Sequence, residues 1–194
     1  MAGHGLQVPE SLRVTEPEAA GEAALKIGFP VVLKGEGLAH KTEAGAVKLN
    51  LRSQSEVEEA ARAMPCDSFL VETMIGAAVA ELLIGVVRDP AHGFVLTLGA
   101  GGVLTEILKD SASLLIPASK DEIFTALSSL KIAPLLGGYR GAAAADSDAI
   151  VAAVEAVQSF VTANADKLEE VEINPLLCTA DNAIAADALI RMES

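Results

Sequence analysis

The sequence predicts an α+β fold arranged in two lobes. Up to about residue 74, short strand patterns alternate with helix patterns, whereas strand patterns dominate the part after Gly76. Apolar residues make up 51% of the 194 residues and aromatic residues only 3%, so the core must be aliphatic. A chain of this length forms one ordinary domain or two small lobes. We expect one lobe over residues 1–74 and a second over residues 75–194.

In the first lobe, a helix is expected from Thr15, at the N-cap position, to the closing Gly28, with Pro17 and Glu18 in its first turn. A glycine-bearing loop separates the next two strands, which we expect to pair like a hairpin. The remaining elements expected here are strands at 30–34, 46–51 and 68–74, and a helix from Ser55 to about Ala63.

In the second lobe, a turn from Pro90 to Gly93 is expected to join two strands. One helix would place Ile123, Phe124, Leu127 and Leu130 on one face. A longer helix would begin at Asp146 and carry a buried stripe, Ile150, Val154, Val157 and Val161. The expected boundaries are strands at 80–89, 93–100, 103–108, 112–117, 168–178 and 183–190, and a helix at 121–130.

Charge and composition exclude several classes of function. The chain has 14 basic and 27 acidic residues, a formal net charge of −13, and such a surface repels phosphate backbones, so nucleic-acid binding is not expected. No apolar run approaches the length of a membrane span, and no signal peptide is recognisable at the start. The two cysteines match no metal-ligand spacing and suggest a reducing compartment. We therefore expect a cytoplasmic protein without membrane attachment.

A short basic stretch stands out in this acidic chain. Lys34 ends a buried strand, and Lys41 follows in a loop beside glycines. Two lysines placed in this way can clamp a nucleotide polyphosphate, although Lys34 alone would also suit a solvated strand edge. His40 directly precedes Lys41, where a neutral imidazole could accept a phosphoryl group or act as a general base. A histidine in a loop is also often without a catalytic role.

The glycine segment, Gly99–Gly102, follows a strand and is a second candidate phosphate contact. It lacks the G-x-G-x-x-G pattern of a dinucleotide-binding turn, and a simple tight turn is the alternative.

The last two strands indicate a metal site. Glu172 and Asn174 differ by two positions and therefore share a strand face, and Asp187 lies in the neighbouring strand. Their oxygen atoms suit Mg²⁺, which commonly takes one or two carboxylates together with substrate phosphates. We expect Pro175 to turn the chain away from this site. A polar strand face without a ligand is the alternative.

Almost the whole chain resembles the ATP-grasp domain of the nucleoside-diphosphate-forming acyl-CoA synthetases. These include the ADP-forming acetyl-CoA synthetases and, more distantly, the succinyl-CoA synthetase β subunit. The segments that carry the resemblance, in chain order, are "GFPVVLKGEGLAHKTEAGAVKLNL", "FLVETMI", "AELLIGVVRDPAHG", "LTLGAGGVLTEILKDSASLLIP", "LLGGYRG", "EVEINPLL" and "AADALI". The resemblance implies an ATP-grasp fold, with two lobes that hold ATP between their sheets.

By this resemblance, Lys34 and Lys41 would hold ATP phosphates, Glu72 would lie near the adenine, and Glu81 near the ribose. Three residues of the glycine segment would line the phosphate path: Gly99, Gly101 and Gly102.

The resemblance also implies which residues are catalytic. His40 falls on the histidine of the "HKS/HKT" loop of the family, which takes part in phosphate handover, and Arg88 and Asp89 fall on its "RDP" turn. We expect these three residues and Lys41 to be catalytic.

The cofactors implied are ATP and Mg²⁺, with Asn174 and Asp187 as the metal ligands.

Two features depart from the family pattern. The loop after Lys34 is one residue shorter before the histidine, and Ala46 replaces a glycine. The CoA-binding domain and the phosphohistidine ligase domain of the family do not occur in the sequence. We expect both as partners, on a longer chain or a separate subunit, with CoA and a small carboxylic acid as substrates and an oligomer as the full assembly.

These observations predict the ATP-binding phosphotransfer part of an ADP-forming acid–CoA ligase. One alternative is a regulatory synthetase-like module of a protein lysine acetyltransferase. Retention of His40, Asn174 and Asp187 favours the active enzyme over that module. A third reading is another ATP-grasp ligase that joins a carboxylate to an amine, which would not need the histidine loop.

Overall fold

The computed structural model describes residues 1–37, 45–102, 105 and 109–193, and divides into two compact units. The smaller unit is Pro9–Ile75, and the larger unit combines Met1–Val8 with Gly76–Ser194. The α+β class is therefore confirmed for each unit. The first eight residues belong to the larger unit, which differs from the expected boundaries, because Leu6 is buried in its core and Gln7 bridges to Ile184.

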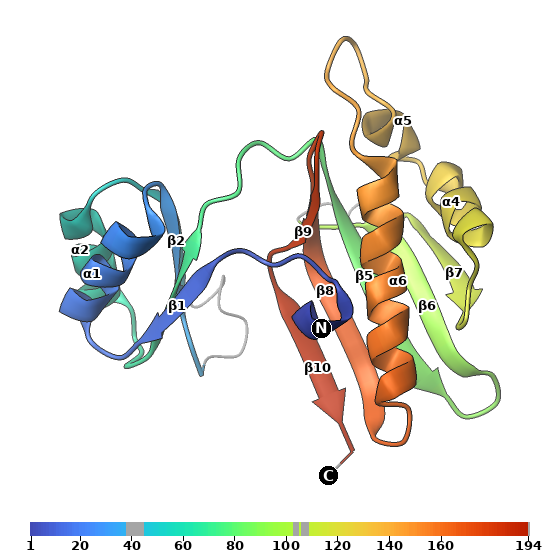
Figure 1. Ribbon diagram of the computed structural model, residues 1–194, viewed down its shortest axis with the longest axis horizontal. Coiled ribbons are helices and arrows are strands. Elements are labelled where there is room, and N and C mark those ends of the chain that lie inside the picture. Colours follow the sequence, from blue (N-terminus) through green and yellow to red (C-terminus); the bar gives the residue numbers. More distant parts are fainter. Residues whose placement is uncertain (38–44, 103–104, 106–108, 194) are drawn as a thin grey trace. The chain divides into compact units, whose positions relative to one another are not determined.

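The smaller unit is a four-stranded sheet covered on one face by two helices (Figure 1). All neighbouring strands are antiparallel, in the order β1-β4-β2-β3. The apolar side chains of α1 and α2 close over Val31, Leu33 and Val71 to form its core. The elements are β1 (Ser11–Val14), α1 (Pro17–Ile27), β2 (Val31–Gly35), β3 (Val47–Leu51), α2 (Gln54–Ala63) and β4 (Phe69–Thr73).

Both helices of the smaller unit form as expected, with corrected starts. The N-cap of α1 is Glu16 rather than Thr15, with Pro17 at the first helical position. The N-cap of α2 is Ser53 rather than Ser55, because the Ser53 hydroxyl accepts the backbone N–H of Glu56. The expected pairing of β2 with β3 is confirmed, although β2 also pairs with β4 and is an interior strand.

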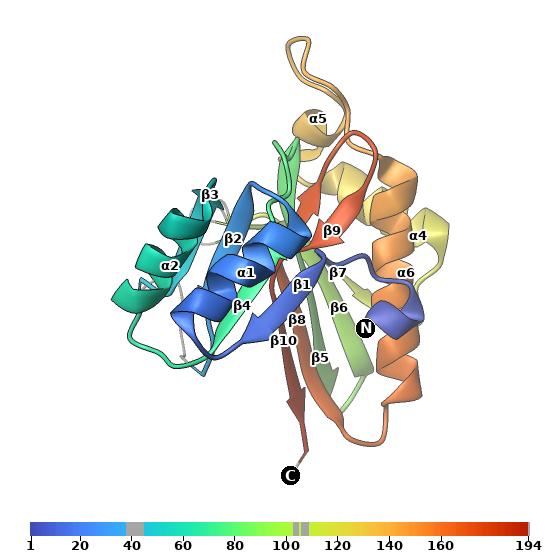
Figure 2. The same cartoon turned by 60° about the vertical axis from the view of Figure 1, so that its left-hand side comes forward.

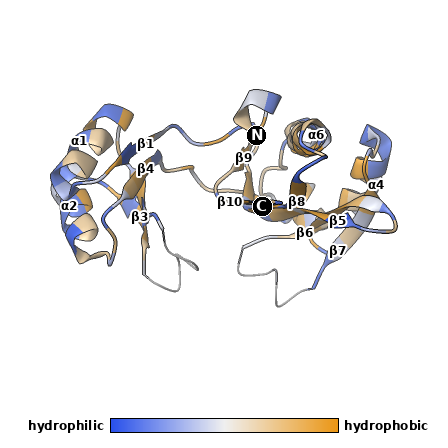
Figure 3. Cartoon of the chain, turned by 90° about the horizontal axis from the view of Figure 1, so that it is seen from below, coloured by the Kyte–Doolittle hydropathy of each residue, from blue (hydrophilic) through white to orange (hydrophobic). Residues whose placement is uncertain are grey.

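The larger unit is built on a six-stranded antiparallel sheet, with β10-β8-β5-β6-β7 in order and β9 paired to β8. Its helices α4 and α6 lie on the same face of this sheet (Figure 3). The elements are η1 (Ala2–His4), β5 (Ala80–Asp89), β6 (Gly93–Ala100), β7 (Ser111–Leu115), α4 (Lys120–Ser129), α5 (Ala133–Leu136), α6 (Ser147–Ala163), β8 (Leu168–Cys178), β9 (Ala183–Ala185) and β10 (Ala188–Met192).

Helix α6 supplies much of the core of the larger unit, and its prediction is confirmed (Figure 2). Asp146 is its N-cap, and its side chain accepts the N–H of Ala149. The four residues of the expected stripe are all buried: Ile150, Val154, Val157 and Val161.

Three local expectations for the larger unit need correction, and a fourth stays open. Phe124 does not share the buried face of α4, because the residue is 55% exposed. The segment expected as one strand at 183–190 is two strands, β9 and β10. Pro175 does not turn the chain away, because β8 continues to Cys178. The strand expected at 103–108 falls almost entirely outside the described residues. Within the described part of the chain, no helix is long and apolar enough to cross a membrane.

Candidate nucleotide and metal site

In the smaller unit, the predicted residues Lys34 and Glu72 lie on the open face, the face of the sheet opposite α1 and α2. Strand side chains alternate between faces, so Val31, Leu33 and Val71 point to the helices while Lys34 and Glu72 point away. They come from the adjacent strands β2 and β4, where Glu72 pairs with Val32, two residues before Lys34.

Lys34 and Glu72 form an ion pair. The Lys34 Nζ lies 2.5 Å from the Glu72 Oε2, and the two side chains are only 11% and 9% exposed. A charge held at such low exposure needs a partner. The structure thus holds Lys34, which was predicted to contact the ATP phosphates, in an ion pair with Glu72, which was predicted to lie near the adenine.

A second ion pair on the open face was not predicted from the sequence. Arg13 on β1 lies 2.6 Å from Glu36, just after β2, and the Ser68 hydroxyl donates to the same Glu36 oxygen at 2.8 Å. The link arises because β4 pairs with both β1 and β2, which places Leu70 between Arg13 and Lys34. Only the strand order reveals this relationship, since nothing in the local sequence pairs these residues.

In the larger unit, the glycine segment is packed too tightly for side chains. Gly99 and Ala100 are the last residues of β6, so only Gly101 and Gly102 leave the strand. A Cβ atom on Gly99 would lie 2.7 Å from the carbonyl oxygen of Asp110, and one on Gly101 would lie 2.5 Å from the backbone of Leu82. These glycines are required by close backbone approach.

Glu81 lies against this segment. Its backbone carbonyl accepts the N–H of Gly101 at 2.9 Å, and a Cβ on Gly102 would collide with its carboxylate. Gly102 has φ 60°, in the left-handed region. The structure therefore brings Glu81, predicted near the ribose, together with the glycines predicted for the phosphates.

Asn174 and Asp187 are opposite each other on neighbouring chain segments. The N–H of Asn174 donates to the Asp187 carbonyl at 3.2 Å, and the pairs on either side are Ile173 with Ala188 and Leu176 with Ala185. This backbone hydrogen bond brings the two residues side by side at the end of the β8–β10 ladder. Asp187 lies in the break between β9 and β10 rather than within a strand, where it is exposed.

This pair fits a magnesium ion. One amide oxygen and one carboxylate on two hydrogen-bonded segments are oxygen donors of the kind Mg²⁺ takes when substrate phosphates complete its shell. Glu172 shares the face of Asn174, as predicted. Its partners across the sheet are Gly85 and Leu189, however, and not Asp187. Among the described residues there is no cluster of three or more His, Cys, Asp or Glu suited to a metal.

The metal pair and the glycine segment are joined directly. The Asn174 Oδ1 accepts the backbone N–H of Gly102 at 2.8 Å. Four of the predicted elements of the site, namely Glu81, Gly102, Asn174 and Asp187, therefore form one connected group.

Arg88 and Asp89 lie at the opposite end of β5 from Glu81. Arg88 is seven positions after Glu81 along the strand, a distance of about 23 Å. The Arg88 Nε donates to the carbonyl of Leu168 at 2.9 Å, and its guanidinium lies over the ring of Phe94. Asp89 accepts the N–H groups of Ala91 and His92 in the turn to β6. The structure does not bring this predicted catalytic pair to the glycine segment. His40 and Lys41 lie outside the described residues.

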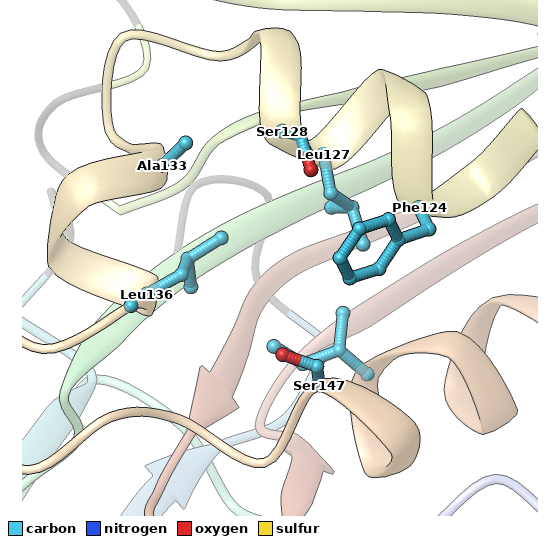
Figure 4. Close-up of a pocket in the computed structure, with 8 residues that line it drawn as sticks. Phe124, Leu127, Ser128, Ala133, Leu136 and Ser147 are labelled. Carbon is cyan, nitrogen blue, oxygen red and sulfur yellow. The ribbon is translucent and has the colours of Figure 1, made fainter. Parts of the chain in front are cut away.

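A separate pocket of about 130 Å³ lies between α4, α5 and the start of α6 (Figure 4). Phe124, Leu136 and Ser147 approach it from these three helices. None of the predicted site residues lines it.

Comparison with known proteins decides the family. A family model described as an ATP-grasp domain matches residues 1–192. This chain belongs to the ATP-grasp family. The ATP-grasp fold predicted from the sequence is thereby confirmed, as is the relation to ADP-forming acid–CoA ligases.

Two curated relatives show how this ATP-grasp domain is used. The β subunit of ADP-forming acetate–CoA ligase I from Pyrococcus furiosus is 31% identical over 95% of this chain and 84% of that protein. Trans-feruloyl-CoA synthase FCS1, from an unknown prokaryotic organism, is 34% identical over 97% of this chain but only 29% of that protein. The chain thus spans less than a third of one relative and most of the other.

Solved structures agree with the ATP-grasp assignment. The dinucleotide-forming acetyl-coenzyme A synthetase 1 of Ca. Korarchaeum cryptofilum, in complex with coenzyme A, Ca-AMPCP and HgCl⁺, matches with a TM-score of 0.89 and 29% identity. The match covers 98% of this chain and 88% of that one. Another structure of the same synthetase, in complex with coenzyme A and Mg-AMPPCP, matches with a TM-score of 0.85 and 31% identity over 98% of this chain and 87% of that one.

Proposed function

We propose that this domain binds Mg-ATP and carries out the phosphoryl-transfer part of an ADP-forming acyl-CoA synthetase. The observation that carries the proposal is the connected group of Gly102, Asn174 and Asp187, which joins a glycine backbone contact to a pair of magnesium ligands. The solved relative in complex with Mg-AMPPCP supports the choice of nucleotide and metal.

The predicted phosphate and metal contacts each have a role in this proposal. Lys34 neutralises phosphate charge, and Asn174 and Asp187 hold Mg²⁺. The glycine segment lines the phosphate path in this proposal, and its lack of bulky side chains leaves room for phosphate oxygens, while its Gly101 and Gly102 N–H groups are held by Glu81 and Asn174. Asn174 and Asp187 would hold Mg²⁺, which would supply electrostatic stabilisation of the charge that develops on the phosphates during transfer.

The complete reaction requires domains in addition to this one. We infer that acid, CoA and ATP are converted to acyl-CoA, ADP and phosphate, with the phosphoryl group carried on a histidine of a partner domain. His40 and Lys41 would receive or guide that group near the ATP phosphates. The partners are the CoA-binding and phosphohistidine ligase domains, within one chain or as a separate subunit, in the cytoplasm.

The regulatory-module reading is not favoured. The curated relatives include five ADP-forming acetate–CoA ligases or ligase subunits. Their acids differ from those of the feruloyl and 4-hydroxybutyrate relatives, although all are 29–34% identical to this chain. We infer that acid selection depends mainly on the partner domains.

Titration calorimetry with Mg-ATP tests this proposal on the 194-residue chain. The wild type should bind Mg-ATP, and Lys34→Ala and Asp187→Asn should each weaken binding by about tenfold, the loss of one charge-assisted contact. Lys120→Ala is a matched control, because Lys120 is an exposed lysine on α4 whose described partner is Glu155. Absence of binding by the wild type, or equal binding by Lys34→Ala and Lys120→Ala, would contradict the proposal.

A further inference from the structure

Asn174 has a contact that its predicted role as a metal ligand does not require. Its side-chain oxygen accepts the N–H of Gly102 at 2.8 Å, although β8, which carries Asn174, is not a neighbour of β6, which Gly102 follows. Asn174 lies on β8 and Gly102 follows β6, and β5 runs between these strands. The amide side chain therefore reaches across a whole strand to hold the backbone of the glycine segment.

An irregularity in β8 makes this reach understandable. Between Leu82 and Ile84 of β5, the paired residues of β8 step from Leu176 to Ile173, so β8 contains one extra residue there. Asn174 belongs to this bulge. A bulge re-aims side chains relative to the regular ladder, and bulges are frequent next to active sites.

The segment that Asn174 holds is constrained on its other side as well. Gly102 has a left-handed φ of 60°, and the Glu81 carboxylate fills the space where a side chain would stand. The preceding N–H, of Gly101, donates to the Glu81 carbonyl. Two successive amides of the glycine segment are thus fixed, one by the β5 backbone and one by the Asn174 side chain.

The oxygen of Asn174 can serve two partners at once. An amide carbonyl oxygen has two lone pairs, and the Gly102 N–H occupies one of them. In the proposed function, the other lone pair would contact the cation that Asn174 and Asp187 hold together.

We propose that Asn174 is a positioning residue that ties the phosphate-contacting glycine segment to the metal pair through a single oxygen atom. This inference rests on the proposed function, in which Asn174 and Asp187 hold Mg²⁺. The inference includes that this hydrogen bond is present without metal or nucleotide, so that the glycine segment is oriented in the free protein. Pre-orientation of this kind lowers the entropic cost of binding the nucleotide.

Hydrogen exchange at the Gly102 amide tests the inference in the 194-residue chain without metal or nucleotide, by NMR. Asn174→Ala removes the acceptor, so Gly102 should exchange about tenfold faster, the equilibrium equivalent of one hydrogen bond. Asn174→Asp keeps an acceptor oxygen and should remain within about twofold of the wild type, on the same scale. Asp187→Asn, the matched control, alters the metal pair without removing this acceptor and should also leave Gly102 unchanged. If Asn174→Ala does not fold, Asn174→Ser replaces it, because serine also lacks the amide oxygen.

Magnesium-dependent ATP binding, measured in parallel, separates this inference from the proposed function. Faster exchange in Asn174→Ala alone, with or without ATP binding by the wild type, supports the positioning role. Equal exchange in Asn174→Ala and the wild type, or a wild-type Gly102 amide that exchanges at the unprotected rate, would overturn it even if Mg-ATP binds as proposed. Absence of ATP binding with the expected exchange pattern would overturn only the proposed function.

Discussion

Lys34 and Glu72 face each other across adjacent strands, with 2.5 Å between ammonium and carboxylate and about a tenth of each side chain exposed. The pair lies on the open face of the smaller sheet, where its charges are partly removed from water. An ion pair at this depth is costly to break from one side, because the remaining charge loses its partner while its desolvation persists.

Glu72→Gln should therefore destabilise the smaller unit by about 3 kcal/mol, as expected for an uncompensated charge with little exposure. Urea unfolding followed by circular dichroism measures the change. The double variant Lys34→Met with Glu72→Leu should recover most of the loss, because apolar residues of similar volume need no partner. A double variant as unstable as the sum of its two single changes would show that the two side chains do not interact.

The turn between β5 and β6 predicts a pH dependence. The N–H of Ala91, and then the side chain and N–H of His92, hold the pKa of Asp89 below its ordinary value. A depressed carboxyl pKa contributes stability that is present above the unfolded pKa of about 3.9 and is lost as the pH falls through the lower folded pKa. Asp89→Ala should thus be less stable than the wild type at pH 7, and the difference should shrink below about pH 4.

Urea unfolding at several pH values between 3 and 7 checks this expectation. His92→Ala is the control for the side-chain contribution, since it leaves both backbone N–H groups directed at Asp89. A difference between Asp89→Ala and the wild type that stays constant over the whole range would exclude the proposed contribution of the carboxylate.

The two cysteines should differ in reactivity. Burial raises the pKa of the Cys178 thiol to about 12, whereas Cys66 is partly exposed. Because the thiolate is the reactive form, iodoacetamide at pH 8 should modify Cys66 in the native chain and leave Cys178 intact. Mass spectrometry after a time course gives the site of modification, and denaturant should make both cysteines reactive. Modification of Cys178 in a native Cys66→Ser variant, at the rate of the denatured chain, would refute this burial.

Residues whose role depends on local periodicity were predictable from the sequence. The stripe Ile150, Val154, Val157 and Val161 repeats at the helical period and is buried in α6. Asn174 was placed opposite Asp187 because two consecutive antiparallel segments bring such residues together.

Relationships that depend on strand order were not predictable. Arg13 meets Glu36 only because β4 is inserted between β1 and β2 in the sheet. The hydrogen bond from Gly102 to Asn174 crosses β5 beside a bulge in β8. The alternation of apolar and polar residues along a strand does not show where the extra residue of a bulge lies. The exposure of Phe124 is a miss of another kind, because an apolar ring on a helix does not by itself define which face is covered.

A buried glutamine on α6 fixes the connection between β7 and α4. The Gln158 Oε1 accepts the N–H of Ala118 at 2.6 Å, and its Nε2 donates to the carbonyl of the same residue at 3.1 Å, with 8% of the residue exposed. Ala118 directly precedes Ser119, the N-cap of α4. Gln158→Ala leaves both backbone groups without a side-chain partner, so it should destabilise the larger unit by about 2 kcal/mol.

The matched control for Gln158→Ala is Thr162→Ala, one turn further along the same helix, whose hydroxyl donates only to the Gln158 carbonyl within the helix. Thr162→Ala should change the free energy of unfolding by less than about 0.5 kcal/mol, as is usual for exposed positions. Hydrogen exchange should locate the effect, with the first turn of α4 losing protection in Gln158→Ala alone. Both substitutions place alanine in α6, but only Gln158→Ala removes the contact with the β7–α4 connection. Equal destabilisation by both variants would therefore contradict the prediction. It would mean that the change within α6, and not the lost hydrogen bonds to Ala118, lowers the free energy of unfolding.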